Sequence, residues 1–212
     1  MKKPNLSLEK NLWRENIKYV IGIDEVGRGA FAGPIVAGAV VFPQIKRIGK
    51  KLAFLKEIND SKQLKAPLRR KLAKLIKKYS LFWSVDEVSI EVINRCGIGF
   101  ANHLVIRQVA KKISSQIQNE SLFILCDGLR VQGLKKHEAI INGDCKSISI
   151  AAASIIAKVH RDSLMREYSK KYHHYKLARN KGYGTKNHRE ALKKYGLSDI
   201  HRTSFELTKF LS

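Results

Sequence analysis

Two classes of residue are scarce in this sequence, and each shortage narrows what the protein can be. Only 18 of the 212 residues are aspartate or glutamate, against 41 lysines and arginines, so that the formal net charge is +23. The three cysteines, Cys96, Cys126 and Cys145, are an odd number without C-x-x-C spacing. Disulfide frameworks and cysteine-based zinc sites need paired or regularly spaced cysteines. We therefore expect neither in this chain.

Long hydrophobic runs are missing as well. Residues 29–45 carry no charge, but prolines and glycines interrupt them. A helix that spans a bilayer needs about 20 mostly apolar residues. The first 18 residues carry charges of both signs and contain no apolar segment of the signal-peptide type. These observations predict a cytoplasmic protein without a membrane partner, and we expect it to be a monomer.

The abundant residues point to a folded protein with an acidic partner. Apolar residues make up 44% of the chain, which is too many for a disordered protein of this charge. The long-range field of such a positive chain favours a polyanion, either a nucleic acid or an acidic membrane surface.

The spacing of apolar residues predicts an α/β fold. Near-continuous apolar runs typical of buried strands lie at residues 19–24, 35–42, 81–85 and 122–126, with a shorter one at 139–141. Helical spacing occurs at residues 67–79, 101–117 and 148–168, whereas the polar residues 173–188 predict a loop. The cations of the first of these helices, among them Arg69, are expected to face solvent. Together the elements indicate a mixed five-stranded sheet flanked by helices, with a C-terminal extension of helices and loops.

Four of the few acidic residues follow predicted strands or a turn. They are Asp24, Glu25, Asp127 and Asp144. Singly, each fits a turn or a solvated strand end, but carboxylates that converge at the ends of buried strands are costly unless they are exposed, paired or bound to a cation. With no paired histidine or cysteine among them, they suit Mg²⁺ or Mn²⁺. In a basic protein this arrangement is typical of two-metal phosphodiester chemistry.

One further aspartate competes with Asp144 for the fourth place. Asp162 lies fourteen helical steps beyond Ile148, which is roughly 21 Å along a continuous helix. It is therefore expected to pair with Arg161, Arg166 or another nearby base.

A short glycine-rich loop follows the first pair of carboxylates. Gly27 and Gly29 flank Arg28; glycine allows close approach of the backbone to a ligand, and arginine can bind phosphate with two parallel hydrogen bonds. Alone, this triplet usually marks only a turn.

Taken together, these motifs resemble those of the type 2 ribonucleases H, the ribonuclease HII family. The matching segments, in order, are residues 23–29 (IDEVGRG), 32–34 (AGP), 60–64 (DSKQL), 143–162, 181–185 (KGYGT) and 201–205 (HRTSF). They cover the chain from about residue 19 to residue 206. The related type 3 enzymes lack the arginine of the loop and have an extra N-terminal domain, so that type 2 is the better match.

The resemblance implies a ribonuclease H-like fold and a metal-dependent endonuclease. Such an enzyme hydrolyses RNA in RNA–DNA hybrids, incises duplex DNA on the 5′ side of a single ribonucleotide, and leaves 3′-hydroxyl and 5′-phosphate ends. The family's four carboxylates fall on Asp24, Glu25, Asp127 and Asp144. The loop that reads the 2′-hydroxyl falls on Gly27, Arg28 and Gly29, and the tyrosine that packs on the sugar at the RNA–DNA junction falls on Tyr183.

Further contacts and a division of the chain are also expected. Lys62, Lys158 and Lys181 lie inside matching segments and are expected to contact phosphates. Residues 1–18 would form a lead-in helix, residues 19–168 the catalytic domain, and residues 169–212 a substrate-binding extension. His201 and Arg202 could contact the substrate backbone or anchor that extension, and anchoring is favoured.

Three residues depart from the family pattern, and two other functions remain open. Asn180 stands where histidine is more frequent, Phe100 where a polar residue is common, and Ala30 where proline or cysteine is frequent. The alternatives are a non-catalytic basic protein that binds RNA or duplexes, and a metal-dependent nuclease of plain DNA. The acidic cluster argues against the first, and the glycine–arginine–glycine loop with Tyr183 argues against the second.

Overall fold

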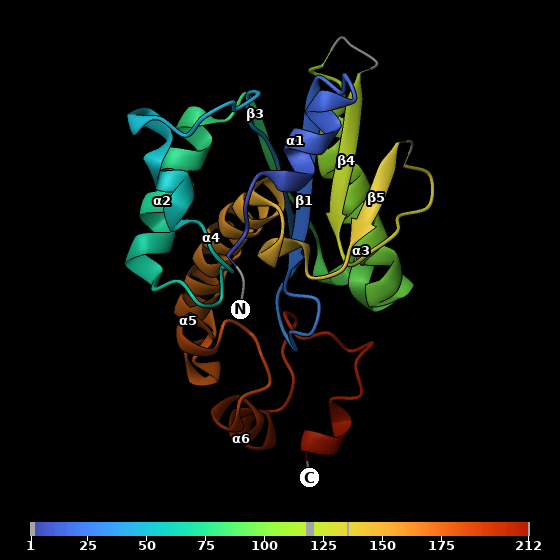
Figure 1. Ribbon diagram of the computed structural model, residues 1–212. Coiled ribbons are helices and arrows are strands. Elements are labelled where there is room, and N and C mark those ends of the chain that lie inside the picture. The colour runs from blue at the N-terminus through green and yellow to red at the C-terminus, as the bar shows by residue number, and fades with distance from the viewer. Residues whose placement is uncertain (1–2, 118–120, 135, 212) are drawn as a thin grey trace.

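A computed structural model describes residues 3–117, 121–134 and 136–211 of the chain. Its centre is a five-stranded sheet with the order β3-β2-β1-β4-β5 (Figure 1). The strands are β1 (Tyr19–Val26), β2 (Ile35–Val41), β3 (Phe82–Val88), β4 (Leu122–Asp127) and β5 (His137–Ile140). β1 pairs antiparallel with β2 and parallel with β4. The predicted mixed five-stranded sheet is confirmed.

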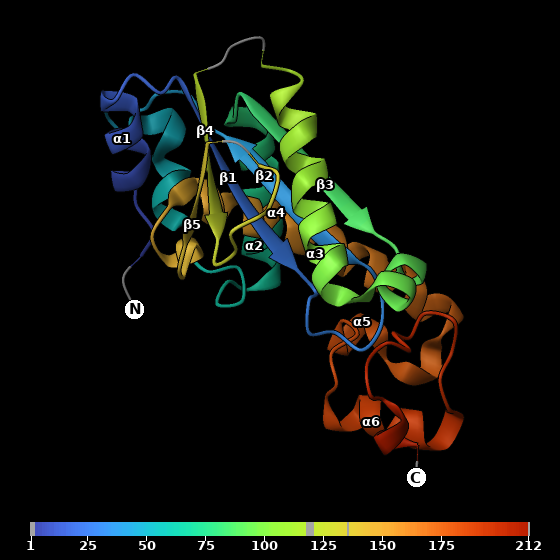
Figure 2. The same cartoon turned by 90° about the vertical axis from the view of Figure 1, so that its right-hand side faces the viewer.

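Helices cover both faces of the sheet (Figure 2). α3 (Ile90–Ser114) packs on one face, where its Ala101, Val105 and Val109 meet Ile21 and Ile23 of β1. α4 (Ile148–Lys171) and α2 (Ala66–Tyr79) lie on the other face. Small residues let α4 approach closely, since a Cβ added to Gly22 of β1 would lie 2.2 Å from the carbonyl carbon of Ser149. This close packing carries α4 along the sheet toward the carboxyl end of β1.

The N-terminal segment is fastened to the beginning of α4. α1 (Ser7–Arg14) carries Glu9, which is fully buried. One oxygen of Glu9 accepts hydrogen bonds from the Ser147 hydroxyl at 2.6 Å and from the Ser149 amide at 2.9 Å. The turn that holds Asp144 therefore lies next to a buried anchor of the N-terminus.

The C-terminal segment is more helical than the sequence predicts. Where a loop is expected at residues 173–188, the chain forms η3 (His173–Tyr175), α5 (Leu177–Asn180) and the start of α6 (Lys186–Tyr195). The Thr185 hydroxyl accepts a hydrogen bond from the His188 amide, which caps α6. The buried side of this helix has only His188, Ala191 and Leu192, so its apolar pattern is weak. Two more short 3-10 turns are η1 (Lys50–Glu57) and η4 (Thr208–Phe210).

Two other differences concern single features. The predicted outward position of Arg69 is wrong: this side chain is buried, and its Nη1 donates to the carbonyl of Ser61 at 2.8 Å. In addition, α3 begins at Ile90, well before the predicted start at residue 101, and Gly97 interrupts it with φ 81°. Within the described ranges no helix combines the length and the apolar character needed to cross a membrane.

Candidate active site

The four acidic residues lie at one end of the sheet and on the turn beside it. Asp24 and Glu25 are near the end of β1, and Asp127 ends the neighbouring parallel strand β4. Ile23 pairs with Cys126, which places Asp24 and Asp127 at adjacent positions of the two strands. Asp144 lies in the 3-10 turn η2 (Gly143–Cys145) just before α4. The ends of parallel strands are where ligands bind in open α/β sheets.

The electrostatics of this cluster are unfavourable without a cation. Asp24 is only 6% exposed. Burial, and then the nearby charges of Glu25, Asp127 and Asp144, raise its pKa well above the ordinary value. Burial also raises the pKa of Glu25 and of Asp127. Such raised pKa values mean that the ionised forms repel one another in a poorly solvated place.

Nearby polar groups offset this repulsion only in part. The Gly143 amide donates to Asp127 Oδ1 at 2.6 Å, and the Glu25 amide donates to Asp24 Oδ1 at 2.7 Å. A hydrogen bond from Ser154 lowers the pKa of Asp24, and one from the buried Asn102 lowers that of Glu25. Ser154 also shares a 2.9 Å hydrogen bond with Ser61. Sequence reasoning missed Ser154 and Asn102 as partners of the cluster.

The donor set fits a hard divalent cation by its chemistry. All four groups are carboxylates, the ligands preferred by Mg²⁺ and Mn²⁺. As the side chains lie, no three His, Cys, Asp or Glu residues in the described part of the chain form a ready cage for an ion. Two aspartate oxygens accept backbone hydrogen bonds instead. Small rotations of these carboxylates would be needed to hold an ion.

A cavity of about 390 Å³ connects the carboxylates with the glycine-rich loop. Its lining comprises Asp24, Glu25, Val26, Gly27, Arg28, Gly29, Ser61, Lys62, Ser154, Lys158 and Tyr183. The fold thus brings together most of the site residues predicted from the sequence. Asp127, Asp144 and Lys181 do not line this cavity.

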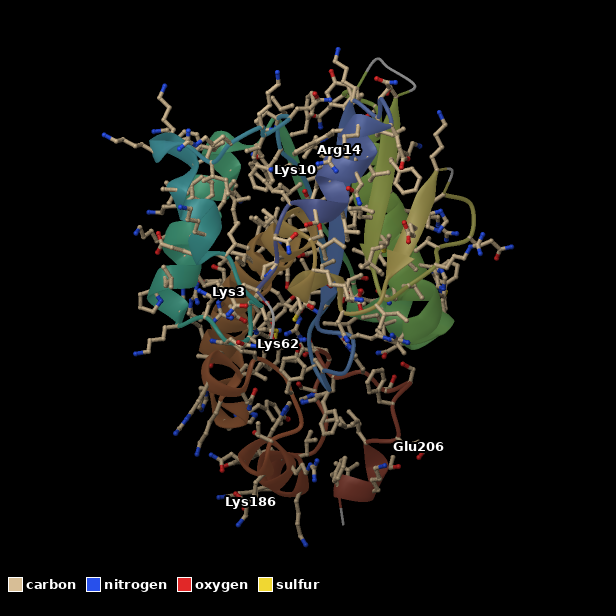
Figure 3. All side chains as sticks on the ribbon, viewed as in Figure 1. Lys3, Lys10, Arg14, Lys62, Lys186 and Glu206 are labelled. Carbon is tan, nitrogen blue, oxygen red and sulfur yellow. The ribbon has the colours of Figure 1, made fainter. Side chains whose placement is uncertain are left out.

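A second groove of about 660 Å³ opens on the far side of Lys62. Asp144 lines it together with Lys3, Lys62 and Lys146, and Lys3 and Lys62 are labelled near each other in Figure 3. Partial burial alone would lower the pKa of Lys62, but the charges of Asp60, Asp24 and Asp144 raise it above its ordinary value. Lys62 therefore stands between the two cavities and close to the acidic cluster.

The two glycines of the loop have different surroundings. Gly27 has φ +97°, and a Cβ there would lie 2.2 Å from Nε of Arg161. A Cβ on Gly29 would meet nothing within 4 Å. Packing within the protein therefore requires glycine at position 27 but not at position 29.

The glycine-rich loop and the Tyr183 loop are joined as one unit. The amides of Phe31 and Ala32 both donate to the carbonyl of Gly182, at 2.8 and 3.2 Å. The Arg161 guanidinium bridges the same two segments, donating to Ala32 at 3.0 Å and to Lys181 at 2.8 Å. It also donates to the carbonyl of Pro34 at 3.0 Å.

A second buried arginine holds the glycine-rich loop from the other side. Arg202 is fully buried, and it donates to the carbonyls of Gly33 at 2.9 Å and Arg28 at 2.8 Å. The expected anchoring role of His201 and Arg202 thus agrees with the contacts. Sequence reasoning missed Arg161 as a central residue, because its position inside a matching segment was the only signal that set it apart.

The predicted phosphate-binding lysines lie in three different environments. Lys62 is exposed, whereas Lys158 forms a 2.6 Å salt bridge with Asp162. Asp162 is thus paired with a base of the preceding helical turn, in keeping with its expected structural role. Lys181 folds back so that its Nζ donates to the Ala178 carbonyl of α5.

Tyr183 lies at the edge of the cavity beside two cations. Its ring centre is 5.4 Å from the Arg161 guanidinium carbon and 5.8 Å from Lys158 Nζ. The loop before it is fastened by Asn180, whose side chain donates to the Tyr175 carbonyl at 2.7 Å and accepts from the Gly182 amide at 2.8 Å. Asn180 therefore serves the backbone of this loop. The other two residues that depart from the family pattern lie in different environments: Phe100 is 48% exposed, and Ala30 is fully buried.

The comparisons with known proteins agree with this arrangement. A family model described as Ribonuclease HII matches residues 21–208. The chain is 42% identical over 198 residues to a ribonuclease HII of Caldanaerobacter subterraneus subsp. tengcongensis, covering 93% of this chain and 78% of that protein. It is 46% identical over 195 residues to a ribonuclease HII of Clostridium beijerinckii, covering 92% and 69%.

The fold is also similar to a solved structure. The crystal structure of Bst-RNase HIII in complex with Mn²⁺ superposes with a TM-score of 0.73 at 22% identity, over 92% of this chain and 69% of that one. With the family match over nearly the whole sheet and C-terminal segment, this chain belongs to the ribonuclease HII family and is an enzyme, a ribonuclease H of type 2.

Proposed function

We propose that this ribonuclease HII is a metal-dependent endonuclease of nucleic acids that contain ribonucleotides. It hydrolyses the RNA strand of RNA–DNA hybrids and incises duplex DNA on the 5′ side of a single embedded ribonucleotide. The products end in a 3′-hydroxyl and a 5′-phosphate. In the cell this activity removes misincorporated ribonucleotides and RNA primers.

The observation that carries the proposal is the buried cluster of like charges beside a basic cavity. In a protein with a net charge of +23, carboxylates of raised pKa at the ends of β1 and β4 are costly to folding. A phosphate group approaching them would be repelled. Bound divalent cations offset both penalties, which supports a metal site at this position.

Four carboxylates would hold the ions: Asp24, Glu25, Asp127 and Asp144. Bound Mg²⁺ or Mn²⁺ would supply an activated water for attack on phosphorus and would stabilise the leaving 3′-oxygen. In this proposal the carboxylates are ligands and do not attack the substrate covalently. The Mn²⁺ complex of the structural neighbour Bst-RNase HIII supports a divalent ion in this fold.

The rest of the cavity would recognise the substrate. The backbone of Gly27, Arg28 and Gly29 lines the cavity next to the carboxylates, where it would read a 2′-hydroxyl, the group that distinguishes RNA from DNA. Tyr183 on the opposite side would pack on the neighbouring deoxyribose. Lys62, Lys158 and Lys181 would contact phosphates, with residues 169–212 serving as the substrate-binding part of the chain.

The test is an incision assay on a DNA duplex that contains one ribonucleotide, with Mg²⁺, Mn²⁺ or EDTA. The expected result is a single cut on the 5′ side of the ribonucleotide in either metal and no cut in EDTA. A DNA duplex of the same sequence without the ribonucleotide is the control and should stay intact. Cleavage in EDTA, or equal cleavage of the control, would contradict the proposal.

A further inference from the structure

Two buried histidines connect the C-terminal segment to the Tyr183 loop. His188, in α6, is fully buried, and His201 is 1% exposed. Their Nε2 atoms are 3.1 Å apart. Because a hydrogen bond needs one donor and one acceptor, only one of these two nitrogens carries the proton.

The contacts at the His201 end determine which nitrogen carries it. The backbone amide of Ser198 donates to His201 Nδ1 at 3.0 Å, so this nitrogen must be unprotonated. A neutral His201 therefore has its proton on Nε2 and donates to His188 Nε2.

The contacts at the His188 end give the same direction independently. His188 Nδ1 lies 3.0 Å from the carbonyl oxygen of Tyr183, which can only accept. His188 thus carries its proton on Nδ1 and accepts at Nε2. Each nitrogen of both rings has a partner, and all the bonds run one way, from Ser198 through His201 and His188 to Tyr183.

The next residue in the chain holds the other recognition loop. Arg202 donates through Nη1 to the Arg28 carbonyl at 2.8 Å and through Nε to the Gly33 carbonyl at 2.9 Å. The Asn94 side chain of α3 donates to the His201 carbonyl at 3.3 Å, which fixes this pair of residues to the body of the protein. His201, through His188, therefore holds the backbone of the Tyr183 loop, and Arg202 holds the backbone of the glycine-rich loop. These two loops line opposite sides of the cavity.

We propose that His188 and His201 are positioning residues that set the selectivity for a single ribonucleotide, through a hydrogen-bond relay that ends on the backbone of Tyr183. The relay holds the Tyr183 ring at a fixed offset from the Gly27–Gly29 backbone, which is held by Arg202. This inference rests on the proposed junction-reading role of Tyr183. Neither histidine lines the cavity, so neither acts on the substrate directly.

The relay also requires both rings to be neutral. The titratable and polar groups around them are Tyr175, His174, Ser198 and Asp199, with Phe31 packed on His188. Burial, and then the neighbouring His188, lower the pKa of His201 to about 4, and burial lowers that of His188. A proton on His201 Nδ1 would face the Ser198 amide, and one on His188 Nε2 would face the His201 proton.

Two substitutions of one residue separate the halves of the relay. In His188→Gln the side-chain carbonyl can still accept from His201, but the bond to Tyr183 is lost. In His188→Asn the side-chain amide can still donate to Tyr183, but it does not reach His201. His173→Gln is the matched control, because His173 is exposed in the same segment and its ring meets that of His174 edge-on.

The experiment compares kcat/KM on a duplex with one ribonucleotide and on a continuous RNA–DNA hybrid. The selectivity ratio is kcat/KM on the duplex with one ribonucleotide divided by kcat/KM on the hybrid. We expect His188→Gln to lower this ratio by roughly tenfold, the size expected for loss of one buried hydrogen bond. His188→Asn should lower the ratio less, and His173→Gln should leave it unchanged. An equal loss on both substrates in His188→Gln would overturn the positioning role and leave a purely structural one.

A second substitution distinguishes failure of this inference from failure of the proposed function. If Tyr183→Ala leaves the ratio unchanged, the proposed junction-reading role of Tyr183 is wrong. If Tyr183→Ala lowers the ratio and the His188 variants do not, only the relay is wrong. In the double variant with Tyr183→Ala, His188→Gln should lower the ratio no further, because the two changes act through one group.

The protonation pattern can be measured without any activity. Imidazole ¹H–¹⁵N correlation spectra of the intact protein at pH 7 should show neutral His201 protonated on Nε2 and neutral His188 protonated on Nδ1. The opposite form in either ring, or a charged ring, would overturn the relay even if the variants failed to fold.

Discussion

The acidic cluster and the pair of joined loops beside it handle buried charge in opposite ways. At the ends of β1 and β4, carboxylates are buried against one another. Hydrogen bonds from backbone amides, together with the charges of Lys62 and Arg28, offset the repulsion only in part. In the joined loops, Arg161 and Arg202 are also buried, but backbone carbonyls accept their protons at 2.8–3.0 Å. The first region is incomplete without a cation, whereas the charges of the second are largely compensated; among the described residues only Nη2 of Arg202 remains as a buried donor of these two arginines without a partner.

This difference distinguishes residues that bind a ligand from residues that hold the protein's loops in place. Charge that the protein leaves uncompensated is available for a ligand, and removing it should favour folding while it abolishes function. Charge that the protein compensates internally holds the loops in place, and removing it should harm folding first. Stability and activity should therefore change in opposite directions in the acidic cluster and in the same direction in the loops.

The largest effect is expected from the carboxylates. Asp24→Asn or Asp127→Asn should abolish cleavage of the duplex with one ribonucleotide, while binding of that duplex in Ca²⁺ survives, because the ligand set is broken but the basic surface is intact. Asp144→Asn should lower turnover far more than Asp162→Asn, since Asp162 is paired with Lys158. Cleavage above about a tenth of the wild-type rate in Asp24→Asn at saturating Mg²⁺ would contradict the metal-ligand role.

The next effect is the loss of a buried arginine. Arg161→Met should lower the free energy of unfolding by about 3 kcal/mol or more, because three carbonyls lose a charged donor. In a chain of this size that corresponds to a fall in the unfolding midpoint of roughly 6–12 °C. Calorimetry measures it, with Arg166→Met as a control on the same helix. An unchanged midpoint would show that the loops do not depend on Arg161.

The two glycines of the loop sharpen the comparison. Gly27→Ala should destabilise the protein by about 1–3 kcal/mol, because of its positive φ and its contact with Arg161. Gly29→Ala should leave stability unchanged and lower only kcat/KM on ribonucleotide-containing substrates. Equal unfolding midpoints for the two variants would mean that the difference in packing does not matter.

The pH dependence of stability should follow the raised pKa of Asp24. A folded-state pKa above the unfolded value penalises folding increasingly as the pH rises from about 4 through the folded-state pKa. In EDTA, Asp24→Asn should thus gain stability over wild type as the pH rises. Urea unfolding at several pH values measures the difference in free energy of unfolding between the two proteins. A difference that does not change with pH would contradict this prediction.

The smallest effect concerns the basic surface as a whole. Because lysine and arginine far exceed the acidic residues, log K for duplex binding in Ca²⁺ should fall with log salt by about 0.9 for each phosphate neutralised. Lys62→Ala should reduce the slope by about one unit if Lys62 contacts a phosphate. A flat dependence between low and physiological salt would show that the charge is not the binding surface.

The sequence predicts the acidic region far better than the loops. Asp24 and Asp127 stand out because acidic residues are rare and follow strongly apolar strands, and pairing of β1 with β4 brings them together. Arg161 is one of 41 cations, and nothing local distinguishes it as a buried arginine. For Arg202 the sequence favours an anchoring role but does not show which carbonyls it holds. Arg69 illustrates the same limit, because helical spacing alone assigns it to the solvent.

Hydrogen bonds that depend on the folded backbone explain the other omissions. Asn180 differs from the family pattern in the sequence, but only the fold shows that it holds the Gly182 amide and the Tyr175 carbonyl. His188 and His201 are thirteen residues apart and meet only because α6 packs under the loop. The tautomer of each ring depends on both partners, which no sequence pattern contains.

The most direct test of the contrast between the two regions is the unfolding midpoint of wild type and Asp24→Asn, each in EDTA and in saturating Mn²⁺. In EDTA, Asp24→Asn should unfold at a higher temperature than wild type, because a repelled buried charge is gone. Mn²⁺ should raise the midpoint of wild type and leave that of Asp24→Asn nearly unchanged. A lower midpoint for Asp24→Asn in EDTA, or an equal Mn²⁺ response in both proteins, would contradict the account.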